Sequence, residues 1–155
     1  MKKVRDVMVK DVVTFKPKDP IHYVAWSLRE KRISGAPVVD GNKVVGVVSE
    51  RDIMRLIEEY DLKINLVFPS PLDVLELPLK IKHELDEMAS LIRETAATAV
   101  EEIMTKKAVT IAPDATVAEA AKIMGERKIN RLPVVNRKGV LVGIITRGDV
   151  IGTLV

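Results

Sequence analysis

The sequence has 155 residues, of which 47% are hydrophobic and 30% charged, with a net charge of +3 and no cysteine. This composition is typical of a globular chain, and it excludes a disordered protein, a disulfide framework and thiolate metal sites. The apolar runs are far shorter than the roughly 20 residues of a membrane span, and the charged N-terminus lacks the apolar stretch of a secretory signal. We therefore expect a cytoplasmic protein without a membrane span.

The first part of the chain predicts a strand, a helix, two strands and a second helix, in that order. The first strand ends before Pro17, and the two later strands flank the turn residues Asp40, Gly41 and Asn42. The helix is indicated by apolar residues at three- and four-residue spacing. The expected elements are a strand at 12–14, a helix that includes Ile21, Val24, Ala25 and Leu28, strands at 37–39 and 44–48, and a helix at about 50–60.

The middle of the chain predicts a helical connection. Ser70, Pro71 and Asp73 have the order of an N-cap, first residue and third residue of a short helix, and a longer helix is expected from Pro78 to about residue 98. Its apolar face comprises Leu85, Met88, Leu91, Ile92 and Thr95. This face either packs on its own module or docks a second subunit or a partner. The segment is acidic, so the two ends of the chain carry the excess positive charge, which either attracts an anion or forms a solvated surface.

The last part of the chain repeats the first. Met8 corresponds to Met104 and Pro17 to Pro113, each 96 positions apart, and Gly46 corresponds to Gly143 after a one-residue insertion. The pattern again predicts a strand, a helix, two strands and a helix, and Thr116 with Glu119 forms a capping-box signature. These elements are expected at 108–111, from 117 to beyond 124, at 133–135, at 140–145 and at about 147–154.

Each repeat ends in the same short motif, written GVVSERD at 46–52 and GIITRGD at 143–149. A buried strand leads to a hydroxyl residue, a helix begins, and an aspartate follows. A carboxylate can accept two strong hydrogen bonds from a cis-diol, and a hydroxyl beside free backbone N–H groups forms an anion site. The same residues are also a helix N-cap signature, and the two interpretations are compatible.

These features resemble the cystathionine-beta-synthase (CBS) domain, of which a tandem pair is called a Bateman module. The resemblance is carried by VMVKDVVTFKP at 7–17, ISGAPVVD at 33–40, INRLPVVN at 129–136 and the two motif endings. It implies an α/β fold in which two β-α-β-β-α repeats pack sheet to sheet. The expected domains are 1–60 and 100–155, with a helical connecting segment at 61–99.

The resemblance also implies adenosine compounds bound in clefts between the two domains. By this resemblance, Asp52 and Asp149 would hold the ribose, and Ser49 and Thr146 would face the phosphate. The adenine would lie against the backbone around Thr14, Lys16, Ala36, Pro37, Thr110, Ala112, Leu132 and Pro133. Candidate phosphate-binding cations are Arg51, Arg131 and Arg147. Because Arg131 and Lys128 stand in the second repeat, we expect that repeat to form the tighter phosphate site.

We expect a non-catalytic, regulatory adenosine-nucleotide sensor, with AMP as the foremost ligand and ADP or ATP as related ones. The alternatives are an S-adenosylmethionine-binding module, and a scaffold or dimerisation subunit with empty clefts. The resemblance further implies a homodimer and a regulated enzyme or transporter as partner. Neither a catalytic cofactor, a metal site nor nucleic-acid binding is expected, since His22 and His83 have no ligands at metal spacing and aromatic residues make up 3% of the chain.

Overall fold

The computed structural model describes the backbone of residues 1–59 and 73–155, and the side chains of the same ranges except for residues 73–81 and 84. The expected cap at Ser70 and Pro71 lies outside the described residues. The elements of the first repeat are α1 (Val4–Val7), α2 (Ile21–Glu30), β1 (Gly35–Asp40), β2 (Lys43–Ser49) and α3 (Glu50–Glu59). The long helix is α4 (Asp73–Ala97). The second repeat has η1 (Val100–Glu102), α5 (Val117–Arg127), β3 (Arg131–Val135), β4 (Leu141–Thr146) and α6 (Arg147–Gly152).

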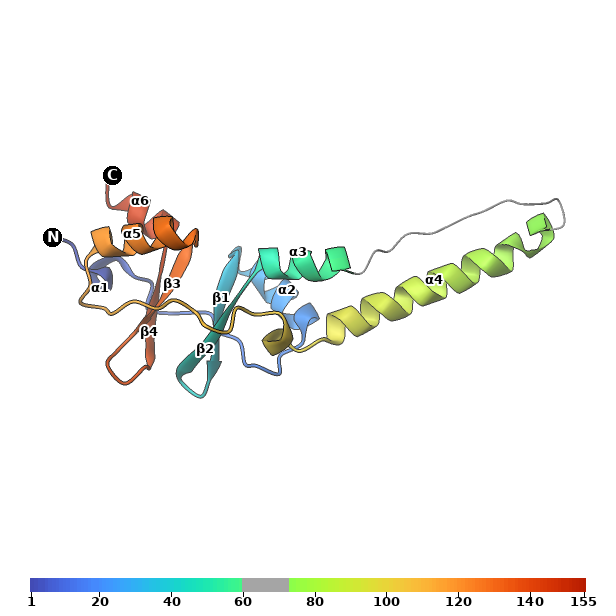
Figure 1. Ribbon diagram of the computed structural model, residues 1–155, viewed down its shortest axis with the longest axis horizontal. Coiled ribbons are helices and arrows are strands. Elements are labelled where there is room, and N and C mark those ends of the chain that lie inside the picture. The colour runs from blue at the N-terminus through green and yellow to red at the C-terminus, as the bar shows by residue number, and fades with distance from the viewer. Residues whose placement is uncertain (60–72) are drawn as a thin grey trace.

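Each repeat forms an antiparallel hairpin covered by helices, and the two hairpins lie side by side (Figure 1). In the first hairpin Gly35 pairs with Ser49, and in the second Arg131 pairs with Thr146. A bridge between Lys43 and Val140 joins the two hairpins. The mixed α/β fold with two packed repeats agrees with the expectation.

The predicted first strand of each repeat is reduced to a single bridge. Phe15 makes a parallel bridge to Val38, with its N–H donating to Pro37 O and its carbonyl accepting from Val39 N–H. The next bonds along this ladder would need N–H groups from Pro37 on one side and Pro17 on the other, and proline has none. Ile111 makes the same bridge to Val134, between Pro133 and Pro113. The prolines therefore limit this pairing to one residue, and the expectation of regular strands at 12–14 and 108–111 was wrong.

The opening segments of the two repeats are exchanged. Val4 of α1 is fully buried in the core of the second repeat, among Ile111, Leu132 and Ile145. Val100 of η1 is fully buried in the core of the first repeat. Burying one such side chain contributes about 1.5–3 kcal/mol, so each repeat depends on the other for part of its core. The packing units thus cross the domain boundaries expected from the sequence.

The exchange continues beyond these helices as a backbone ladder. Val9 exchanges two hydrogen bonds with Ile144 of β4, both 2.9 Å long. Thr105 exchanges two with Val47 of β2, at 2.9 and 3.0 Å. The exchanged segments therefore pair with the edge of β2 that is not bonded to β1 and with the edge of β4 that is not bonded to β3, beside the motif residues.

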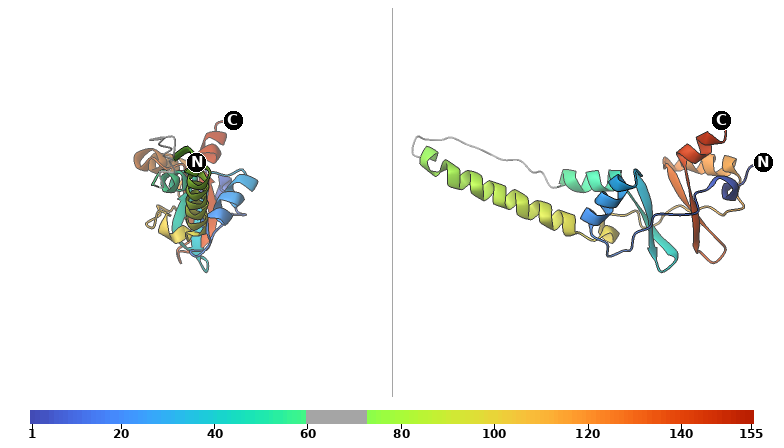
Figure 2. Two further views of the ribbon diagram at one scale, coloured as in Figure 1. Left: turned by 90° about the vertical axis from the view of Figure 1, so that its right-hand side faces the viewer. Right: turned by 180° about the vertical axis from the view of Figure 1, so that it is seen from behind.

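The connecting helix α4 projects away from the two-hairpin body, as views from opposite sides show (Figure 2). It is continuous from Asp73 to Ala97, so the short helix and the longer helix that were expected before and after Pro78 form one element. A proline inside a helix removes one backbone hydrogen bond, and here the helix continues through it. The apolar face is partly covered, because Met88 and Leu91 are half-buried whereas Leu85 and Ile92 are about half exposed.

Candidate functional site

The two motif aspartates organise the turn from a buried strand into a helix. In the second repeat, the N–H and Oγ1 of Thr146 donate to Asp149 Oδ2 at 2.8 and 2.9 Å, and Asp149 N–H donates back to Thr146 Oγ1 at 3.2 Å. In the first repeat, the N–H and Oγ of Ser49 donate to Asp52 Oδ2 at 2.9 and 3.2 Å. The helix-cap interpretation is therefore confirmed in full for the second repeat, and for the first repeat in the bonds that the carboxylate accepts.

These bonds use Oδ2 of both carboxylates. Oδ1 of Asp52 lies 3.8 Å from Nη1 of Arg55, in an i, i+3 pair on α3. Asp52 is nearly buried, and its side chain is 7% exposed. One oxygen thus fixes the local turn, and the second keeps its capacity to accept hydrogen bonds from a bound molecule.

The motif glycines give the exchanged segments room to pass. A Cβ on Gly46 would stand 2.5 Å from Met104 Sδ and 2.9 Å from the backbone oxygen of Thr105. A Cβ on Gly143 would stand 2.5 Å from Met8 Sδ and 3.0 Å from Val9 O. These glycines are therefore required for the close approach that forms one wall of each cleft.

The first cavity, here called the Asp52 cleft, has a volume of about 400 Å³. It combines three separate parts of the chain. The motif residues Ser49 and Asp52 form one side, the exchanged segment at 105 and 107–109 forms another, and residues 128–131 of the second repeat form the third. A volume of this size is typical of small-molecule sites.

The second cavity, here called the Thr146 cleft, has a volume of about 420 Å³ and the corresponding construction. Its walls are Thr146 to Gly148, the exchanged segment at 9 and 11–13, and residues 32–35 of the first repeat. Each cleft therefore takes its hydroxyl from one repeat and its facing loop from the other.

The predicted site residues are distributed unevenly over these cavities. Ser49, Arg51 and Asp52 line the Asp52 cleft, Thr146 and Arg147 line the Thr146 cleft, and Asp149 is held one turn away by Thr146. The residues expected to hold adenine lie outside both cavities. Ala36, Pro37, Leu132 and Pro133 are buried in β1 and β3, Thr14 and Lys16 are exposed, and Thr110 and Ala112 line a separate hollow of about 330 Å³.

The exchange of the opening segments explains why Thr14 and Lys16 do not line the Asp52 cleft. It places Thr105 and Lys107 to Val109, rather than Thr14 and Lys16, next to Ser49 and Asp52. The sequence alone could not show which opening segment lies beside which motif, because the opening segments of the two repeats have the same local pattern. Only tertiary packing distinguishes them. The pairing of Val47 with Thr105 is the contact that decides it.

Arg131 belongs to both cavities. It lies at the start of β3 in the second repeat, and its Nη2 donates to Ser34 Oγ of the first repeat at 2.5 Å. Partial burial of the guanidinium lowers the pKa of Arg131, while the nearby charges of Asp52 and Glu50 raise it and Arg51 lowers it. Because a guanidinium keeps its proton in proteins, Arg131 is a cation placed between the two repeats, close to the Asp52 cleft.

The Asp52 cleft collects more positive charge than the Thr146 cleft. Its lining includes the cations Arg51, Arg55, Lys107, Lys128 and Arg131, against the acids Glu50 and Asp52. The Thr146 cleft has Arg32, Arg131 and Arg147 against Asp11. Lys128 thus lines the first repeat's cleft although it belongs to the second repeat by sequence, where we expected it to contribute to the phosphate site. The larger number of cations in the Asp52 cleft argues against the expectation that the second repeat forms the tighter phosphate site.

The described residues include no group of three or more histidine, cysteine and acidic side chains arranged to hold a metal ion. Among the described helices, none combines the length and the apolar character required to cross a membrane.

Comparison with known proteins gives consistent matches over nearly the whole chain. The sequence model of the CBS domain matches residues 4–59 and 100–155. The uncharacterized protein MJ1426 of Methanocaldococcus jannaschii is 40% identical over 153 residues, which cover 98% of this chain and 90% of that protein. The crystal structure of CBSX2 in complex with AMP, a protein of Arabidopsis thaliana, superposes with a TM-score of 0.71 at 28% identity and covers 99% of this chain and 96% of that one. The CBS domain pair of MJ0100, crystallised with 5′-methylthioadenosine and S-adenosyl-L-methionine, has a TM-score of 0.73 at 22% identity, with coverage of 99% and 96%, and shares the fold.

Proposed function

Because the chain belongs to the CBS domain family, with two such domains in tandem, we propose that it is a regulatory module that binds adenosine nucleotides, AMP foremost, without catalysis of its own. The Asp52 cleft is the observation that carries this proposal. It brings a carboxylate, a hydroxyl, the start of a ten-residue helix and several cations to one cavity. The AMP complex of CBSX2, a relative of the same fold, supports the choice of ligand.

The chemistry of the Asp52 cleft suits a ribose phosphate. Asp52 Oδ1 would accept hydrogen bonds from the ribose hydroxyls, while Oδ2 keeps its bonds to Ser49. The phosphate would lie near Ser49 and the first turn of α3, where backbone N–H groups and the helix dipole favour an anion. The exchanged segment at 107–109 would close the cleft on the base side.

The charge of the cleft favours a phosphate-bearing ligand over S-adenosylmethionine. Arginine binds phosphate oxygens through a planar fork, and Arg51 and Arg131 both line this cavity. The sulfonium group of S-adenosylmethionine is a cation and would meet an excess of positive charge. We therefore rank AMP and ADP first, with the Asp52 cleft as the tighter phosphate site.

Calorimetric titration with AMP, ADP, ATP and S-adenosylmethionine tests the proposal. We expect AMP to bind wild type in the micromolar range or better, and S-adenosylmethionine to bind more weakly. Tighter binding of S-adenosylmethionine would replace the proposed ligand class. If none of the four binds and purified protein carries no adenosine compound by mass spectrometry, the module is a scaffold with empty clefts.

A further inference from the structure

A three-residue partition separates the two clefts. Ser34, Asn130 and Arg131 line both cavities, and the bond from Arg131 Nη2 to Ser34 Oγ joins the two repeats across this partition. Arg131 is the only one of the three that carries a charge. One guanidinium therefore faces two cavities that each contain a motif hydroxyl.

The repeat does not duplicate this arginine. The position that corresponds to Arg131 in the first repeat is Gly35, which begins β1 as Arg131 begins β3. A Cβ on Gly35 would stand 2.6 Å from Cζ and Nη1 of Arg131, so the guanidinium occupies the space that a side chain there would need. The pair Gly35 and Arg131 thus turns two equivalent positions into one shared cation.

We propose that Arg131 is a specificity-determining residue shared by both clefts, so that two phosphate-bearing ligands compete for its single charge. This inference rests on the proposed function. The first bound phosphate neutralises the guanidinium and draws its fork toward one cleft. The second phosphate then meets one cation fewer and a nearby negative charge. Anionic ligands consequently bind the two clefts with negative coupling, whereas an uncharged nucleoside fills both independently.

The remaining charges indicate which of the two clefts loses affinity for the second ligand. The Asp52 cleft retains Arg51, Arg55, Lys107 and Lys128, against Glu50 and Asp52, when Arg131 is engaged elsewhere. The Thr146 cleft retains only Arg32 and Arg147, with Asp11 opposing them. The Thr146 cleft therefore depends more strongly on Arg131, and it is the cleft that loses affinity when the Asp52 cleft is occupied.

The test compares AMP binding to wild type with binding to Asp52→Asn, which disables the ribose contact of the first cleft and keeps the shape of the side chain. Calorimetry of the full chain at low salt measures both. We expect AMP to bind the Thr146 cleft of Asp52→Asn at least about fivefold more tightly than it binds in the second step of wild type, a factor at the lower end of known couplings. Adenosine should show no such difference.

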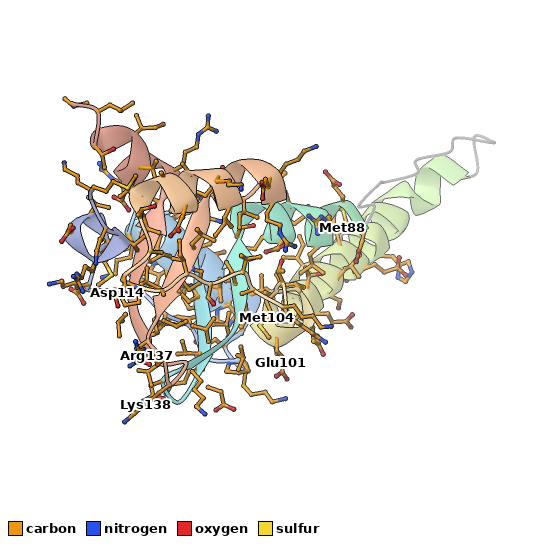
Figure 3. All side chains as sticks on the ribbon, turned by 60° about the vertical axis from the view of Figure 1, so that its left-hand side comes forward. Met88, Glu101, Met104, Asp114, Arg137 and Lys138 are labelled. Carbon is orange, nitrogen blue, oxygen red and sulfur yellow. The ribbon has the colours of Figure 1, made fainter. Side chains whose placement is uncertain are left out.

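Two further variants assign the effect to Arg131. When Arg131→Ala is added to wild type and to Asp52→Asn, the tighter AMP binding at the Thr146 cleft of Asp52→Asn should disappear. Arg137→Ala, in the exposed turn between β3 and β4 (Figure 3), should leave this difference in AMP affinity unchanged. Thermal melting checks that each variant is folded. Three results would each overturn the inference and leave the proposed function standing. The Thr146 cleft of Asp52→Asn could bind AMP no more tightly than the second step of wild type, adenosine could show the same difference as AMP, or the difference could persist when Arg131→Ala is present. Absence of AMP binding at either cleft would overturn both.

Discussion

Met104 and Gly46 belong to different repeats, yet Met104 Sδ stands 2.5 Å from the position that a Cβ on Gly46 would take. The backbone oxygen of Thr105 stands at 2.9 Å from the same position. A flexible sulfur could move aside, but the backbone of Thr105 is fixed, because its oxygen accepts the N–H of Val47 and its N–H donates to Val47 O. The glycine is therefore a packing requirement of the exchanged segment.

Gly46→Ala should destabilise the protein by about 1–3 kcal/mol, because the added methyl group overpacks a closed contact. Gly125→Ala is the matched control, since Gly125 lies in α5 and a Cβ there meets no atom within 4 Å. That change should stabilise the protein by about 0.5–1 kcal/mol, because alanine favours a helix interior. Urea unfolding measures both. A Gly46→Ala protein as stable as wild type would show that the exchanged segment shifts at little cost.

Thr116→Ala should lower the free energy of unfolding by about 1 kcal/mol, since Thr116 Oγ1 accepts the N–H of Glu119 at 3.1 Å and caps α5. The exposed residue Thr14 provides a control, and Thr14→Ala should change stability by less than about 0.5 kcal/mol. Urea unfolding of both variants decides the matter. Equal effects at the two positions would mean that the cap does not stabilise α5.

Local pattern was sufficient to predict the repeat, the hairpins and the caps. The Thr116 and Glu119 pair and the Thr146 and Asp149 pair form capping boxes as their spacing indicates. These features depend on residues three or four positions apart. A reader of the sequence could thus place most elements within a few residues of their bounds.

Contacts between distant segments could not be predicted in this way. Val4 and Val100 have the same local pattern, and either could fill either core. The exchange decides which opening segment lines which cleft, and the packing of the two repeats places Lys128 in the first repeat's cleft and Arg131 in both. The proline pairs were visible in the sequence, but their effect on the ladder depends on the register between Phe15 and Val38.

We predict that the protein is a homodimer that pairs through the helices of its first repeat. Tyr23 and Trp26 on α2 and Met54 and Ile57 on α3 are 45–61% exposed, and large apolar side chains gathered on two helices in contact are typical of an interaction surface. The homodimer implied by the resemblance makes a second copy of this chain the expected occupant of this face. Light scattering should report a dimer for wild type, and Trp26→Lys should shift it toward monomer.

Ile92→Lys separates this face from the apolar stripe of α4, where Ile92 is 52% exposed. We expect this variant to remain dimeric. Dissociation of Ile92→Lys with an intact Trp26→Lys dimer would assign the interface to α4, and a monomeric wild type at high micromolar concentration would end the dimer prediction.

Asp52→Ala should weaken AMP binding at the Asp52 cleft at least about tenfold, because it removes hydrogen bonds from a charged acceptor to the ribose, each worth about 1.5–3 kcal/mol. The substitution also removes the bonds from Ser49 N–H and Oγ, and the loss of this cap should cost about 1 kcal/mol of stability. Asp52→Asn separates the two roles. Its amide oxygen still accepts the Ser49 N–H, so stability should recover while AMP affinity stays low.

Asp19→Ala is the matched control for the cap. Asp19 Oδ2 accepts the N–H of Lys16 at 2.8 Å before α2, and Asp19 lines neither cleft. The variant should lose stability by a similar amount and bind AMP as wild type does. Calorimetry and urea unfolding of Asp52→Ala, Asp52→Asn and Asp19→Ala give the full comparison. Unchanged AMP affinity in both Asp52 variants would place the ribose away from this carboxylate, whereas reduced affinity in Asp19→Ala would show that binding follows overall stability rather than the Asp52 contact.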